Sequence, residues 1–222
     1  MNRLLVSAVL VFFLIASSAH AADREMYFSG NLGISLLSNA NNDQAGVVLE
    51  SGYDPGFNAG IALGYDFGDF RAEGEVAYHS NDLDTITAGA ITVPAEGTVS
   101  ALSFMANGYY DFSSRKSFRS RKSSRSRKSL VVPYLGIGIG FAKVDADMSI
   151  PGFGGQFIDD SAIALAYQFM AGVGFDISSK TTLTIGYRYF ATTNPQYEDL
   201  SAVPFDSEYQ SHNINVGIRL AF

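Results

Sequence analysis

The chain has 222 residues, a formal net charge of −7 and no cysteine, and apolar residues make up 47% of it. A length of this order usually means one folded domain, and the absence of cysteine excludes disulfides and thiolate metal sites. After position 21 the apolar residues are interrupted by Gly, Ser, Asn and charged residues, so no segment there has the roughly 20 apolar residues of a membrane-spanning helix. The classes that remain are a soluble domain and a membrane β-barrel.

Residues 1–21 have the layout of a secretory signal peptide. A short positive start ending at Arg3 precedes an apolar run from Leu4 to Ile15, and Ala19 and Ala21 are small residues at the two positions that a signal peptidase reads. The apolar run is also shorter than the ~20 residues of a helical membrane span. We expect cleavage after Ala21 and export of residues 22–222; an uncleaved anchor is the alternative.

Eight segments of the exported part alternate between large apolar residues and small or polar ones. This is the pattern of β-strands, because successive side chains of a strand point to opposite faces. Most of the segments are close to the ~9–11 residues that a tilted strand needs to cross the hydrocarbon. In chain order they cover residues 28–36, 57–67, 70–78, 102–112, 131–141, 163–176, 182–189 and 213–222.

An even number of such segments predicts an all-β fold, an eight-stranded antiparallel up-and-down transmembrane β-barrel. Its large apolar side chains would face lipid, and its small and polar side chains would fill a narrow lumen. A soluble β-sandwich in the periplasm is the alternative, and it would place the large apolar side chains inside.

The connections between the segments alternate in length. Gly68-Asp69 is a minimal hairpin, and residues 177–180 form another short link. Short turns on the periplasmic side and long loops outside are typical of outer-membrane barrels. The expected long, polar loops cover residues 37–56, 80–97, 145–160 and 191–211.

Residues 113–129 depart from this arrangement, because they stand where a short periplasmic turn is expected. They contain five tandem triplets, three of them Arg-Lys-Ser and the others Phe-Arg-Ser and Ser-Arg-Ser, and they hold eight of the fifteen Lys and Arg residues. We expect a basic low-complexity periplasmic turn. It either docks on anionic lipid headgroups or cell-wall polymer, or is a repeat expansion that the loop tolerates. Export makes nucleic-acid binding an unexpected role.

The long loops hold fourteen of the 22 acidic residues. They would project a negative potential outward and favour cations, including divalent ions near lipopolysaccharide. The densest pairs are Asp159-Asp160 and Glu198-Asp199, which are the candidate cation ligands. Their spacing matches no calcium-binding loop, so solvated acidic loops are the default interpretation, and neither a metal nor a cofactor is predicted.

Five charged residues point into the lumen by strand phase. An isolated buried charge is very costly, so these side chains are expected to form an ion-pair network. The network would either plug the lumen or act as a gate on a thin ion path. A wide aqueous channel is not expected, because open porins use about 16–18 strands. The five residues are Arg71, Glu73, Glu75, Arg188 and Arg219.

Two Ser–His neighbours could suggest a hydrolase, namely His79-Ser80 and Ser211-His212. Adjacent strand residues face opposite sides, so neither pair can meet on one face. The sequence therefore predicts that the protein is not an enzyme.

Several segments together resemble the OmpA-like and opacity-type small barrels, also called porin-family outer-membrane β-barrel proteins. The resemblance rests on residues 26–33, 62–75, 107–112 and 133–140, and on the last strand, which ends in Phe222. It implies an outer-membrane location, contact with membrane lipids and lipopolysaccharide, and a role for Phe222 as the C-terminal signal read by the barrel-assembly machinery.

The resemblance also implies a barrel that supports the envelope and presents loops to an external ligand or a host surface. The predicted function is therefore a structural or surface-interaction barrel with a plugged or narrow polar lumen. The alternatives are a small ion or solute porin gated by the lumen ion pairs, and a surface adhesin.

Overall fold

The computed structural model describes residues 25–38, 40–44, 47–88, 91–112, 131–149, 156–193, 196–198, 204–206 and 209–222. The expected signal peptide at 1–21 and the basic segment at 113–129 lie outside these ranges, so both remain predictions. Within the ranges, no helix has the length and apolar character to cross a membrane.

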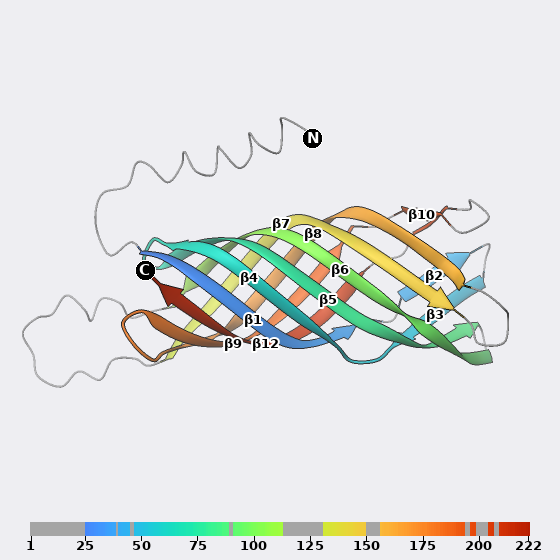
Figure 1. Ribbon diagram of the computed structural model, residues 1–222, viewed down its shortest axis with the longest axis horizontal. Coiled ribbons are helices and arrows are strands. Elements are labelled where there is room, and N and C mark those ends of the chain that lie inside the picture. Colours follow the sequence, from blue (N-terminus) through green and yellow to red (C-terminus); the bar gives the residue numbers. More distant parts are fainter. Residues whose placement is uncertain are drawn as a thin grey trace, which may run out of the picture.

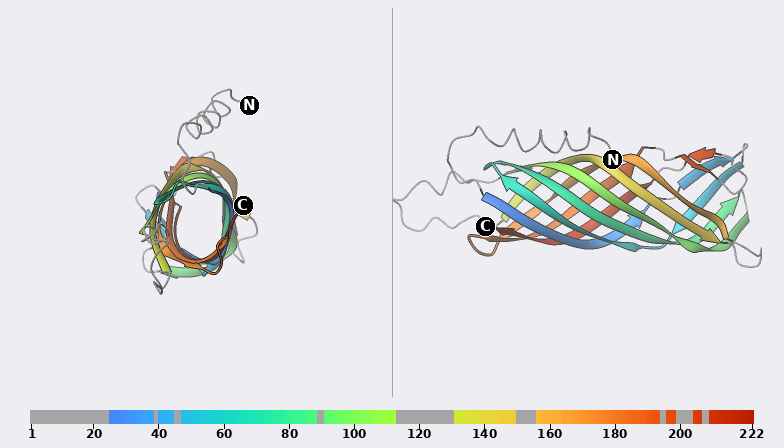
Figure 2. Two further views of the ribbon diagram at one scale, coloured as in Figure 1. Left: turned by 90° about the vertical axis from the view of Figure 1, so that its left-hand side faces the viewer. Right: turned by 45° about the horizontal axis from the view of Figure 1, so that its top comes forward.

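Eight strands form a closed antiparallel barrel, as predicted, and Figure 2 shows the closed ring in the view along its axis. The first and last strands close it, with a register that runs from Tyr27↔Ala221 to Leu37↔Ser211. Closure leaves no open sheet edge within the barrel wall, which is what a sheet in lipid needs. The strands are β1 (Glu25–Leu37), β4 (Gly56–Asp66), β5 (Phe70–Ala88), β6 (Ile91–Asp111), β7 (Val131–Ser149), β8 (Gln156–Asp176), β9 (Thr181–Thr192) and β12 (Gln210–Ala221).

Four shorter strands lie at one end of the barrel. A hairpin of β2 (Ala40–Gln44) and β3 (Val47–Tyr53) pairs through β3 with the outer part of β5. β10 (Gln196–Glu198) and β11 (Pro204–Asp206) form a separate hairpin. We call this end the distal end; the start of β1 and the end of β12 lie at the opposite, terminal end (Figure 1).

Two tight connections at the terminal end confirm the predicted short turns. Gly68 has a φ of 111°, a conformation that glycine adopts without steric cost, and its N–H donates to the Asp66 carboxylate at 2.8 Å. Between β8 and β9, the Ile177 N–H donates to the Thr181 carbonyl at 2.9 Å.

The distal connections are shorter than the sequence predicted. The segment 80–97, expected to be a loop, is mostly paired strand. β5 and β6 pair from Ser80↔Ser100 to Ala88↔Ile91, with a register shift between Leu83 and Thr85. β7 and β8 also continue into the expected loop at 145–160. Strand structure continues because apolar side chains such as Leu83 and Val99 keep alternating inward there and are buried.

The large apolar side chains face outward, which confirms the membrane orientation and contradicts the soluble sandwich. Ile137 is 64% exposed and Ile163 is 74% exposed, whereas the inward Ala101 and Ala142 are buried. Aromatic side chains border this apolar surface, as in interfacial girdles. At the terminal end, the ring centroids of Phe70 and Tyr110 are 5.0 Å apart.

Candidate functional site

Three tyrosines fill the terminal half of the lumen. Tyr27, Tyr109 and Tyr134 reach it from β1, β6 and β7, and glycines on neighbouring strands provide the space they occupy. A Cβ atom on Gly136 would lie 2.5 Å from Cδ1 of Tyr109. Any larger residue at Gly136 would therefore push the ring out of place in an interior that has little spare volume.

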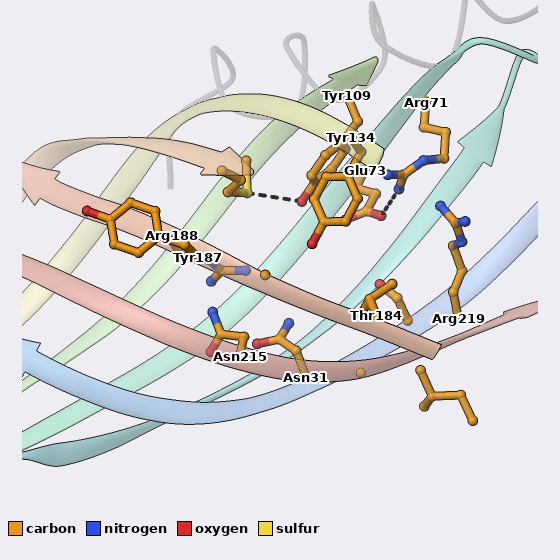
Figure 3. A pocket seen from close by; sticks show the side chains of 15 residues that line it. Asn31, Arg71, Glu73, Tyr109, Tyr134, Thr184, Tyr187, Arg188, Asn215 and Arg219 are labelled. Carbon is orange, nitrogen blue, oxygen red and sulfur yellow. Dashed lines mark hydrogen bonds and ion pairs between the residues drawn. The ribbon is translucent and has the colours of Figure 1, made fainter. Parts of the chain in front are cut away.

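The first polar cluster is built around Arg71. Its Nε and Nη2 donate to the two carboxylate oxygens of Asp111 at 2.8 and 3.0 Å, and its Nη1 donates to Glu73 at 3.1 Å. The Tyr27 hydroxyl also donates to Glu73, at 2.6 Å. The guanidinium carbon of Arg71 lies 4.3 Å from the ring centroid of Tyr109, and Figure 3 shows the ion pair between Arg71 and Glu73. The bidentate pair is the geometry that makes an arginine–carboxylate contact strong.

The second polar cluster is built around Glu75, in the middle of the lumen. Its carboxylate accepts four hydrogen bonds, which come from four other strands of the barrel. The donors are Arg188 at 2.6 Å, Asn107 at 2.7 Å, Gln168 at 3.0 Å and Asn31 at 3.3 Å. A buried carboxylate satisfied from several directions ties the walls of the cylinder together across the lumen.

The distal part of the lumen contains an apolar layer beside buried polar side chains such as Asn81 and Asn213. His79 is fully buried and stacks on Phe190, with ring centroids 4.7 Å apart, and Tyr209 packs against Phe190. Small and branched apolar residues on β6, β7 and β8 point inward and complete this layer. They include Val99, Ala101, Val144, Ala146, Ala162 and Ala166.

All five charged residues predicted for the lumen lie on its inner face. Arg71 and Glu73 pair in the first cluster, and Glu75 and Arg188 pair in the second. Arg219 stands apart, since its Nη1 lies 3.8 Å from Asp111. The sequence analysis did not select Asp111. It could have done so, because Asp111 alternates with the outward apolar residues of segment 102–112 and therefore points into the lumen.

The acidic loop candidates are not assembled into a described site. Asp159 and Asp160 lie in β8 with backbone partners in β7, and Glu198 lies in β10; Asp199 is outside the described residues. Within the described part of the chain, no group of three or more His, Asp or Glu residues could hold a metal ion. The cation site therefore stays a prediction.

The two Ser–His neighbours lie as the strand phase predicted. His79 is buried in the lumen, whereas His212 is exposed on the outer face, where its Nδ1 lies 2.6 Å from the Tyr187 hydroxyl. Ser211 points inward and is buried, so it faces away from its histidine neighbour. Phe222 lies at the terminal rim, is exposed, and donates its N–H to the Met26 carbonyl at 2.9 Å.

Comparisons with known proteins agree with this architecture. The family described as outer membrane protein beta-barrel domain matches residues 6–222. Outer membrane protein PagN of Salmonella typhimurium is 25% identical in an alignment of 250 positions. The alignment covers 96% of this chain and 97% of that protein. A Rickettsia prowazekii protein named "Putative adhesin RP828" is 24% identical, with 99% of each chain covered. The crystal structure of Neisserial surface protein A matches with a TM-score of 0.56 and 19% identity, over 89% of this chain and 97% of that chain, which shows a shared fold.

Proposed function

Since this chain belongs to the outer membrane protein β-barrel domain family and is located in the outer membrane, we propose that it is a closed surface-interaction barrel that binds an external partner at its distal end. The observation that carries the proposal is the contrast between the two parts of the molecule. Side chains cross the lumen at successive levels along its length, while paired strands extend beyond the outward apolar residues at the distal end.

The orientation rests on the two ends of the barrel. Small outer-membrane barrels have short periplasmic turns and longer external segments. The tight turns at Gly68 and at residues 177–180 lie at the terminal end, together with the start of β1 and the end of β12. The additional hairpins, β2–β3 and β10–β11, lie at the distal end (Figure 1). The distal end is therefore the external one in this proposal.

The outward faces of β5, β6 and β7 support a membrane boundary near Lys143. Phe141 is the last large apolar residue that faces outward on β7, and Lys143 follows it, forms an ion pair with Asp145 and is exposed. On the neighbouring strands, Thr98 donates to Asp82 at 2.9 Å. Beyond this polar belt the strands form a platform in water, and this platform would carry the external ligand or the host surface.

The filled lumen argues against the alternative of a small porin. The Arg71 and Glu75 clusters occupy the terminal and middle parts, and the layer of His79 and Phe190 closes the distal part. An ion would have to displace all three layers, and separating buried partners without replacement is costly. The lumen in this proposal holds the barrel rigid instead of conducting.

The other expected partners are components of the outer membrane and its assembly system. Lipids and lipopolysaccharide would cover the apolar outer face, and the barrel-assembly machinery would read the C-terminal strand that ends in Phe222. The two curated relatives are an outer-membrane protein and a protein named as an adhesin, which supports a binding role over an enzymatic one.

In planar bilayers, the protein is expected to give no steady single-channel current. Glu75→Gln keeps a similar side-chain shape and is also expected to give none, because the other layers stay in place. A porin with about 16–18 strands in the same bilayers serves as the positive control. A steady current in the unaltered protein that Glu75→Gln abolishes would contradict the plugged lumen and favour the pore.

Replacing residues 194–208, which include the β10–β11 hairpin, by a short Gly/Ser linker is expected to abolish adhesion of cells that carry the protein to host cells. Loops on a rigid scaffold carry the binding residues in such proteins, and the replaced residues lie beyond the buried Phe190 and before the buried Tyr209. Heat-modifiable gel mobility should show that the barrel still folds.

The matched control shortens residues 113–129, which connect β6 to β7 in the sequence. This change is expected to leave adhesion intact, because the proposal places these residues in the periplasm. Adhesion that survives the first change, or that disappears with the second, would contradict the proposed surface.

A further inference from the structure

One histidine ring lies at the centre of the distal lumen. His79 on β5 is fully buried, and its ring stacks on that of Phe190 on β9, with ring centroids 4.7 Å apart. The ring of Tyr209, the residue that precedes β12, meets the imidazole edge-on, with centroids 6.5 Å apart. A single imidazole therefore connects β5, β9 and the start of β12 at this level of the barrel.

The two ring nitrogens of His79 have no hydrogen-bond partner within the residues that the structure describes. The polar groups closest to the ring are side-chain amides. Asn58 on β4 lies opposite His79 in the strand register, and Asn213 on β12 also faces the ring. An amide oxygen can accept a proton from an imidazole, but it carries no charge with which to neutralise an imidazolium.

The charged groups near His79 already form a matched pair. They are Arg188 and Glu75, whose side chains meet at 2.6 Å, and the Glu75 carboxylate also accepts hydrogen bonds from three side-chain amides. Tyr209 is the other titratable group against the ring, and a phenol stays neutral at and below neutral pH. A proton on His79 would therefore add a buried charge that has no counter-charge of its own.

We propose that His79 is an acid-sensitive switch, and that its protonation opens the aromatic layer formed by His79, Phe190 and Tyr209. The neutral ring packs as an aromatic side chain. The protonated ring is an unpaired cation in a buried layer, which is very costly, and stacking on Phe190 offsets only part of that cost. The closed layer therefore loses stability as the pH falls below about 6.5, where a solvated histidine takes up a proton.

Opening of this layer would loosen the distal end of the barrel in acid. The Thr192 N–H donates to the Tyr209 carbonyl at 3.0 Å, which ties the end of β9 to the start of β12 beside the aromatic layer, so this link should weaken together with the layer. That the switch responds to the external medium rests on the orientation given under the proposed function. The switch itself does not depend on what the distal end binds, so it can fail while the surface role holds.

The first test measures amide hydrogen exchange by NMR in the refolded mature protein at pH 7.5 and pH 5.0, with rates corrected for the intrinsic pH dependence of exchange. Protection of the Thr192 amide is expected to fall about tenfold at pH 5.0. The Phe67 amide, which donates to the Phe70 carbonyl at 2.8 Å at the terminal end, should keep its protection. Unchanged protection at Thr192, or an equal loss at both amides, would overturn the switch.

A second test uses the fact that residues 22–222 contain two histidines, the buried His79 and the exposed His212. In urea unfolding from lipid vesicles, His79 is expected to raise the unfolding equilibrium constant about 30-fold between pH 7.5 and pH 5.0, or roughly tenfold for each pH unit below 6.5. His79→Gln and His79→Phe should each remove this share of the pH response, whereas the matched control His212→Gln should retain it. A full pH response in both His79 variants would overturn the switch.

Discussion

Replacing Glu75 by Ala is expected to lower the free energy of unfolding by about 3–5 kcal/mol, because removal of one partner leaves a buried charge uncompensated. The Glu75 carboxylate accepts hydrogen bonds from Arg188, Asn107, Gln168 and Asn31, and both it and Arg188 are buried. The loss should appear as a lower urea midpoint when the barrel unfolds from lipid vesicles.

Two further variants test the cause of that loss. Adding Arg188→Leu to Glu75→Ala should recover part of the stability, since an apolar side chain at position 188 removes the unpaired charge. Asp145→Ala removes a carboxylate from an exposed ion pair with Lys143 and should cost about 0–1 kcal/mol. If Glu75→Ala costs no more than Asp145→Ala, the middle of the lumen is hydrated and the polar plug does not exist.

Replacing Ile137 by Arg is expected to destabilise the barrel in a bilayer by about 2–4 kcal/mol, the range measured for a lipid-facing cation at the midplane. Ile137 is 64% exposed and lies midway along the outward apolar residues of β7, which run from Val131 to Phe141 before Lys143. The measurement is reversible unfolding from lipid vesicles, because a detergent micelle does not have the defined thickness on which the cost of a buried charge depends.

Ile177→Arg provides the matched control. Ile177 is 63% exposed but lies in the turn between β8 and β9 at the terminal rim, where the same change should cost about 0–1 kcal/mol. Equal costs at the two positions would show that the apolar surface of β7 does not face the hydrocarbon, and the membrane orientation would be wrong.

Local alternation was enough to predict the number of barrel strands and the direction of their side chains. The period of two is a property of each strand by itself, so Arg71, Glu73 and Glu75 could be assigned to the lumen without knowing their neighbours. The tight turn at Gly68 was equally local, since it depends on the conformational freedom of one residue.

The distal region was predicted less well because its polar residues masked the alternation. Asp82 and Asp84 suggested a loop, yet the inward Leu83 and Asn81 are buried and keep β5 paired with β6. Composition indicates how polar a segment is. Strand pairing depends instead on whether the adjacent strand continues alongside the segment in a matching register.

The sequence by itself determined that this protein is an eight-stranded barrel with charges inside, because the alternation of side chains along a strand depends only on the residues of that strand. Only the tertiary structure decided which charges meet. Arg188 and Glu75 are 113 positions apart and come together across the lumen, while Arg71 pairs with Asp111 on the adjacent strand. Such contacts depend on the tilt and stagger with which the sheet closes, and those are properties of the whole cylinder that no single strand encodes.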